Sequence, residues 1–130
     1  MYGAYNNGGG IRYAIQVRKG NFEAENAKIR TMYIGTFDSG SPNSGGSIKI
    51  KNSSIIGVHF NPGSGYGSWE LLNNYFEGMW NYVYFWYPRE KFIIKGNVFY
   101  NFSTFSIGFR SDQLQSAPQI MNNIFVTDDS

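Results

Sequence analysis

The residues of this chain best suited to bind a ligand are aromatic and alternate along one short segment. Tyr82, Tyr84 and Trp86 occupy every second position there, and the apolar Val83 and Phe85 lie between them. In a β-strand such alternation places the two sets on opposite faces, so the first set is expected to face outward. Exposed aromatic rings stack on the apolar faces of sugar rings, and an exposed apolar patch marks a binding surface. The sequence therefore predicts a carbohydrate-binding strip, unless these rings pack under a loop, a neighbouring domain or another subunit.

Four further residues are expected beside this strip. Trp80 would extend it, and Tyr33 is expected near the same face in an earlier coil. His59 and Arg110 would flank it, the first as a candidate general base and the second as a bidentate partner for an acidic sugar. The repeat described below places no carboxylate beside His59, so a surface histidine and a solvated arginine are the simpler interpretations.

Acidic residues can form catalytic pairs or bind metal ions. Glycoside hydrolysis requires two carboxylates that face each other across the substrate. Here the repeat alternates acidic and basic residues in two outward columns, which favours cross-strand charge pairing: Glu23, Lys49 and Glu70 form one column, and Glu25, Lys51 and Lys95 form the next. No three acidic residues converge in this alignment and the chain has no cysteine, so no metal site is predicted.

An eight-residue pattern that occurs five times must position all of these side chains. It reads apolar, any, apolar, any, Asn or Gly, small or Asn, any, apolar, and its copies begin at Phe22, Ile48, Trp69, Phe92 and Pro118. The copies are spaced 26, 21, 23 and 26 residues apart, which is the period of a solenoid. The first half of each copy alternates as a strand does, with one side buried.

The fifth position of each copy predicts a sharp turn. Asparagine and glycine adopt the left-handed backbone conformation at the least cost, and their side chains could also hydrogen-bond from coil to coil as an asparagine ladder. The predicted turn residues are Asn26, Asn52, Asn73, Gly96 and Asn122.

A further strand is expected after this turn in the first four coils. Aligning these strands places Ile34, Val58, Val83 and Phe105 in one inward row and Phe60, Phe85 and Ile107 in another, with His59 opposite Tyr84 and Ser106 one coil later. No segment has an apolar period of 3.6 residues over ten positions, so almost no α-helix is expected.

These coils resemble those of a known family. Segments 72–76, 95–101 and 121–125 are similar to the "NN-x-F" coils of right-handed parallel β-helix proteins of the pectate-lyase-like superfamily. The resemblance covers roughly residues 11 to 128 and implies an all-β fold, a single-stranded parallel β-helix of about five right-handed coils. Residues 1–10 are then a flexible or capping segment, and residues 11–130 form the β-helix domain.

The resemblance leaves the activity open, because the superfamily contains polysaccharide lyases, polygalacturonases, pectin esterases, alginate epimerases and phage tailspikes. It implies a polysaccharide partner and a location outside the cell or on a cell or virion surface. Calcium is a cofactor by this resemblance alone, since several of the lyases use it; no other cofactor is expected. The paired aspartates and histidine-glycine of polygalacturonases and the arginine-rich lyase signature are missing, which places catalysis in doubt.

Composition further narrows the cellular location and the classes of function. Charged residues make up only 15% of the chain and aromatic residues 18%, a profile common among secreted or surface β-proteins. The net charge of +2 and the scattered lysines and arginines give no support to nucleic-acid binding. The longest apolar run, 79–87, is far shorter than the roughly 20 residues that a membrane-spanning helix needs. The absence of cysteine favours a bacterial or phage product, and the first residues do not have a signal-peptide pattern.

Three functions are consistent with these observations. The first is an extracellular module that binds or processes carbohydrate, and the second is a structural or receptor-binding β-helix of a phage tailspike or surface fibre. The third is a polysaccharide lyase or glycoside hydrolase, with His59 and Arg110 as its candidate residues. Five coils would form a stack only about 24 Å tall with two open ends, so flanking coils of a longer chain or a homotrimer are expected to cover them.

Overall fold

The computed structural model describes residues 2–6, 11–17, 19–31, 33–36, 46–60, 67–86, 91–102, 104–108 and 115–127. Within these ranges the regular structure consists of strands alone, which confirms the all-β prediction. The strands are β1 (Tyr2–Asn6), β2 (Ile11–Val17), β3 (Asn21–Glu25), β4 (Lys28–Arg30), β5 (Tyr33–Thr36), β6 (Ser47–Lys51), β7 (Ser54–Phe60), β8 (Ser68–Leu72), β9 (Tyr75–Trp86), β10 (Phe92–Lys95), β11 (Val98–Tyr100), β12 (Thr104–Gly108), β13 (Gln119–Met121) and β14 (Ile124–Val126).

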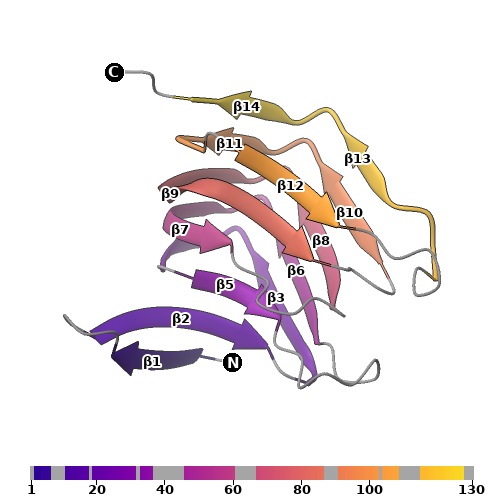
Figure 1. The fold of residues 1–130 in the computed structure, drawn as a ribbon. Coiled ribbons are helices and arrows are strands. Elements are labelled where there is room, and N and C mark those ends of the chain that lie inside the picture. The colour runs from indigo at the N-terminus through magenta and orange to yellow at the C-terminus, as the bar shows by residue number, and fades with distance from the viewer. Residues whose placement is uncertain are drawn as a thin grey trace.

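The strands form two sheets, and the chain passes repeatedly from one to the other (Figure 1). One sheet has five parallel strands in the order β13-β10-β8-β6-β3. The other has nine, in the order β1-β2-β5-β7-β9-β11-β14, with β4 beside β7 and β12 beside β9. The described pairs of this second sheet are parallel, apart from the antiparallel pair of β1 with β2 at its edge. We call one strand of the five-stranded sheet, together with the strands that follow it in the other sheet, a rung.

The register of the five-stranded sheet coincides with the repeat seen in the sequence. Equivalent residues of successive copies lie directly opposite one another, as the pairs Phe22 with Ile48, Ile48 with Trp69, Trp69 with Phe92 and Ile94 with Ile120 show. Parallel strands in this arrangement need a long connection back to the same edge, and the second sheet supplies it in every rung. The predicted stack of parallel strands is therefore present.

Each strand of the five-stranded sheet ends at a left-handed residue. The φ angles are 52° at Asn26, 49° at Asn52, 56° at Asn73, 70° at Gly96 and 57° at Asn122. These are the five positions at which the sequence predicts a turn. A Cβ at position 96 would meet Oδ1 of the exposed Asn73 side chain in the preceding rung, and that side chain would have to move.

The hydrogen-bonded asparagine ladder lies one residue later than predicted. Asn97 Oδ1 accepts from Asn74 N at 3.0 Å and from Asn74 Nδ2 at 3.1 Å, and Asn97 Nδ2 donates to Leu71 O at 2.8 Å. Asn123 repeats these bonds toward Asn97 and toward the carbonyl of the strand before. The left-handed asparagines are exposed, whereas Asn74 and Asn97 are buried. The turn therefore directs the following side chain inward, where it reaches the amides of the neighbouring rung.

The core lies between the two sheets and follows the predicted alternation. Its fully buried large side chains are Trp69, Phe76, Phe85, Phe92, Phe99, Ile34, Ile48, Ile50, Ile55, Leu71 and Ile94. Phe76 and Phe99 stack with ring centroids 5.2 Å apart, and Phe99 stacks on Phe125 at 5.1 Å. Sequence reasoning missed β2 and its buried Ile15 and Val17, although Ile11, Tyr13, Ile15 and Val17 alternate as strand residues do.

The predicted register of the further strands is wrong by two residues at β7. Phe60, rather than Val58, lies opposite both Ile34 and Val83, so Phe60 is not aligned with Phe85. From Val58 to Phe60 the chain advances two residues along β7, while its partner β9 advances five, from Gly78 to Val83. A second irregularity lies between Ile56 and Val58, where β7 has one residue more than its partner β9. Gly57, at a φ of 76°, is this additional residue. β7 has one additional residue and β9 then has three, which leaves a net shift of two, and hydrophobic alternation does not distinguish registers that differ by two residues.

Candidate functional site

The centre of the predicted strip lies on β9 where β12 pairs with it. Val83 and Phe85 are fully buried, and positions 82, 84 and 86 alternate with them. The register places Tyr84 opposite Ser106 and Trp86 opposite Gly108, and the first of these pairs is the one that the sequence predicts. The neighbouring positions on β12 therefore carry small residues.

The side chains of all seven predicted site residues lie outside the part of the molecule that the structure describes. For Tyr33, His59, Trp80, Tyr82, Tyr84 and Trp86 only the backbone is described, and Arg110 is not described at all. Tyr33 lies on β5, which is separated from β9 by β7 in the same sheet. The pair of Phe60 with Val83 removes the predicted alignment of His59 with Tyr84. Trp80 belongs to the stretch of β9 that is out of register with β7.

The outer face of the five-stranded sheet carries the two charged columns. Glu70 forms ion pairs with two lysines, from Oε2 to Lys49 Nζ at 3.9 Å and from Oε1 to Lys91 Nζ at 3.6 Å. The first column therefore pairs across strands as predicted. In the second column Leu72 lies between Lys51 and Lys95, so the alternation of Glu and Lys stops there. Because these pairs are partly exposed, each contributes at most about 1 kcal/mol to stability.

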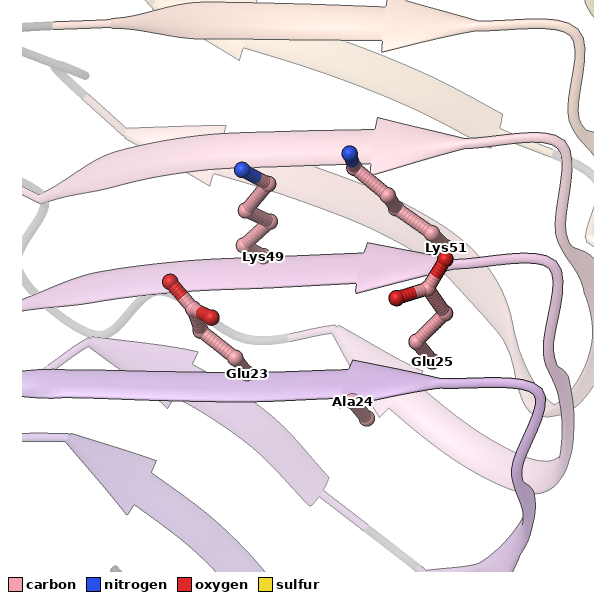
Figure 2. A pocket seen from close by; sticks show the side chains of 5 residues that line it. All are labelled: Glu23, Ala24, Glu25, Lys49 and Lys51. Atoms are coloured by element: carbon pink, nitrogen blue, oxygen red, sulfur yellow. The ribbon is translucent and has the colours of Figure 1, made fainter.

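A shallow depression of about 230 Å³ lies where these columns begin, lined by Glu23, Ala24, Glu25, Lys49 and Lys51 (Figure 2). The charged side chains of β3 and β6 project from the outer face of the sheet there. Carboxylates and ammonium groups alternate, so the depression could offer both acceptors and donors to a polar ligand. Glu23 and Glu25 stand on the same face of one strand, which does not provide the opposed pair that glycoside hydrolysis uses.

Tyr75 is the described residue whose acidity is clearly altered. Partial burial raises the pKa of its phenol, and the nearby Glu77 carboxylate and Tyr100 raise it further. The Tyr75 hydroxyl donates to Glu77 Oε2 at 3.5 Å, and this hydrogen bond also favours the protonated phenol. Tyr75 therefore stays protonated at neutral pH and can serve as a hydrogen-bond donor.

Two negative findings hold for the described ranges. They contain no group of three or more histidine, cysteine, aspartate or glutamate side chains that could hold a metal ion. They also contain no helix that is long and apolar enough to cross a membrane.

Comparisons with protein-family models, with curated proteins and with solved structures found no match for this chain. The chemistry of its own surfaces is therefore the basis for a functional proposal.

Proposed function

We propose that this chain is a right-handed parallel β-helix module that binds polysaccharide outside the cell or on a cell or virion surface. The ligand-binding face is the outer side of β9 and β12, where Tyr82, Tyr84 and Trp86 are the contact residues. Arg110 and Tyr33 extend the face, and Trp80 borders it. The pectate-lyase-like resemblance of the coils supports the handedness and the carbohydrate ligand.

One observation carries the proposal, namely the register between β9 and β12. The aromatic positions of β9 alternate with the buried Val83 and Phe85, and their neighbours on β12 are Thr104, Ser106 and Gly108. Small residues at these positions support the proposal, because they occupy little space beside the aromatic positions. A row of accessible aromatic rings would be suited to stacking on successive sugar units.

Binding without a chemical step is the function that the described residues support best. The charged residues of β3, β6 and β8 alternate in sign from strand to strand, and Lys49 pairs with Glu70, which is the arrangement of a structural surface. Catalysis by His59 would need a carboxylate beside it, and the observed register no longer places this residue opposite Tyr84.

The proposal is tested by substituting the strip and measuring binding to a panel of immobilised acidic and neutral polysaccharides. The double variant Tyr84→Ala and Trp86→Ala should weaken binding at least about tenfold, because each stacked ring contributes roughly 0.5 to 1.5 kcal/mol beyond its buried area. Tyr75→Ala is the matched control, since it removes an exposed tyrosine from the opposite end of the same strand. Circular dichroism establishes that each variant keeps its β-structure.

Equal binding by the double variant and the wild type would exclude the strip as the ligand site. Light-scattering mass on the same sample separates the proposal from a structural role. A monomer that binds polysaccharide supports it, whereas a trimer without glycan binding would favour a structural or receptor-binding segment of a phage tailspike or surface fibre.

A further inference from the structure

The corner between β6 and β7 places an exposed asparagine before a buried serine. Asn52 is left-handed, with a φ of 49°, and Ser53 follows it in the ladder position. Asparagine is among the thermolabile residues of proteins, because the backbone nitrogen of the residue after it can attack its side-chain amide. Serine favours this attack, since its side chain is small and its hydroxyl makes its own backbone N–H more acidic. The corner therefore holds both reactants of a deamidation.

Deamidation at this corner has water as its only co-reactant. Ser53 N forms a bond to Cγ of Asn52, and its proton passes through solvent to the side-chain nitrogen, which leaves as ammonia. Water then opens the resulting five-membered succinimide at either of its carbonyl groups. One opening gives aspartate. The other gives isoaspartate, in which the main chain runs through the former side chain and is one carbon longer.

The ladder holds the attacking nitrogen in the folded chain. Ser53 N donates to Asn74 Oδ1 at 3.0 Å, and this hydrogen bond is buried. The Asn74 amide is itself fixed, because its Nδ2 donates to Ile50 O at 2.8 Å and to Asn97 Oδ1 at 3.1 Å. An N–H that donates to a buried acceptor is not available to the solvent base that must deprotonate it. The ladder bond therefore opposes the first step of the reaction.

The left-handed conformation of Asn52 separates the two reacting atoms as well. A φ of 49° belongs to the region in which ψ is about +47°, and this ψ directs the next backbone nitrogen away from Cβ. Attack on Cγ requires rotation about the Cα–C bond of Asn52. The same rotation turns the Ser53 N–H away from Asn74, so the reaction and the ladder bond exclude each other.

The corners on either side of Asn52 are protected in the same way. Ala27 N donates to Ser53 Oγ at 3.1 Å. Asn74 N donates to Asn97 Oδ1 at 3.0 Å. Alanine has no hydroxyl and asparagine is bulkier than serine, so the corner at Asn52 has the highest intrinsic reactivity of the three. The left-handed residues of the other two corners are Asn26 and Asn73.

We propose that Asn52 is a deamidation site that the ladder keeps unreactive, and that it is converted when the bond from Ser53 N to Asn74 Oδ1 opens. Both ends of the corner are fixed to neighbouring rungs, since Asn52 N donates to Leu72 O at 3.0 Å and Ser54 N donates to Ala27 O at 2.9 Å. The additional carbon of isoaspartate breaks one of these bonds, so conversion disrupts the corner irreversibly. This site is independent of the polysaccharide-binding face.

The first test compares the folded chain with a peptide that has no ladder. The full chain and a synthetic peptide of residues 49–56 are incubated at mildly alkaline pH, and mass spectrometry of peptic fragments gives the rate at each asparagine. Conversion must be assigned to a position, because the sequence also contains Asn7-Gly8 and Asn43-Ser44. Asn52 should react at least about tenfold more slowly in the chain than in the peptide, the equivalent of one hydrogen bond.

Two substitutions should release different corners. Asn74→Ala removes the acceptor of Ser53 N, so Asn52 should react about tenfold faster while Asn26 keeps its rate. Ser53→Ala removes the acceptor of Ala27 N but leaves the backbone nitrogen at position 53 bonded to Asn74, so Asn26 should react faster and Asn52 should not. Because each variant contains one released and one protected corner, general unfolding is distinguished from loss of a single ladder bond.

Three results would overturn the proposal. The first is an equal rate for Asn52 in the wild-type chain and in the peptide. The second is an unchanged rate for Asn52 in the Asn74→Ala variant. The third is equal acceleration of Asn26 and Asn52 in both variants, which would mean that deamidation follows opening of the whole stack.

Discussion

At each corner of the stack two consecutive residues have separate roles. The first adopts a left-handed conformation and faces solvent, and the second enters the interior and bonds to the next rung, as Gly96 and Asn97 do. A buried amide is tolerated there because both its donors and its acceptor are satisfied. Serine continues the ladder at position 53, where its hydroxyl accepts from Ala27 N, and alanine ends it at position 27.

Replacement of Asn97 by alanine should be severely destabilising. The side chain is fully buried, and its loss leaves Asn74 N, Asn74 Nδ2 and Leu71 O without that partner. Each unsatisfied buried group costs roughly 1 to 3 kcal/mol, so the free energy of unfolding should fall by about 3 kcal/mol, measured by urea denaturation. Asn52→Gly is the control, because glycine tolerates the left-handed φ of that exposed residue. Similar losses in both variants would contradict the role assigned to the ladder.

Among the strands, β7 and β9 determine how the candidate site is built. Each of them is one continuous strand through a corner of the stack. In other rungs the same corner separates two strands, such as β4 from β5 or β11 from β12. Gly78 is required in β9 at this corner, since a Cβ there would approach the Phe102 ring to 2.7 Å and Asn101 O to 2.9 Å. The irregular register beyond Gly78 decides which residues of β7 lie beside the aromatic positions of β9.

Replacement of Phe85 by alanine tests the assignment of the two faces of β9. The ring of Phe85 packs edge-on against Trp69 and Phe92, with ring centroids 4.9 Å and 5.1 Å apart. Truncation of Phe85 therefore leaves a cavity inside the core. The free energy of unfolding should fall by roughly 3 to 5 kcal/mol, measured by chemical denaturation. Ile56→Ala on β7 is the control, because Ile56 is partly exposed and its truncation should cost about 1 kcal/mol or less. A tolerated Phe85→Ala would mean that the inner and outer faces are exchanged.

Over the whole molecule, each described rung contacts mainly the rungs next to it in the two sheets. Stability in such a stack is the sum of local terms and neighbour interfaces, so inner rungs are protected on both sides and the β13–β14 rung on one. Ile120 and Phe125 are exposed because the β13–β14 rung packs against another rung on one side only in this structure.

Hydrogen exchange should therefore vary along the stack. The amides of Leu71 and Ile94, in inner strands of the five-stranded sheet, should exchange most slowly, and those of Ile120 and Ile124 should exchange fastest among strand residues. Two-dimensional NMR of the full chain after transfer to deuterated water provides the measurement. Uniform protection from β8 to β14 would show instead that the stack opens as a single cooperative unit.

The strands, the corners and most of the core follow from the sequence because each depends on local chemistry. Alternation identified the inward residues of the repeat, including Trp69 and Phe92, and asparagine or glycine identified the left-handed turn that ends each strand of the five-stranded sheet. The ladder was predicted one residue too early, because composition alone does not show which of two adjacent asparagines turns inward. The predicted position of His59 relative to Tyr84 was also wrong, because the irregularities of β7 and β9 add up to a net shift of two residues, which alternation does not reveal.

The exposure of β13 and β14 likewise separates what the local sequence determines from what the stacking of rungs determines. Segment 115–127 carries the same repeat as the inner rungs, and local sequence makes Ile120 and Phe125 core residues. Whether a residue of this kind is buried depends on a neighbouring rung, which is a contact between segments more than twenty residues apart. Alternation and turn chemistry are local and can be read along the chain, whereas register, the ladder and the exposure of an edge arise only when the rungs are stacked.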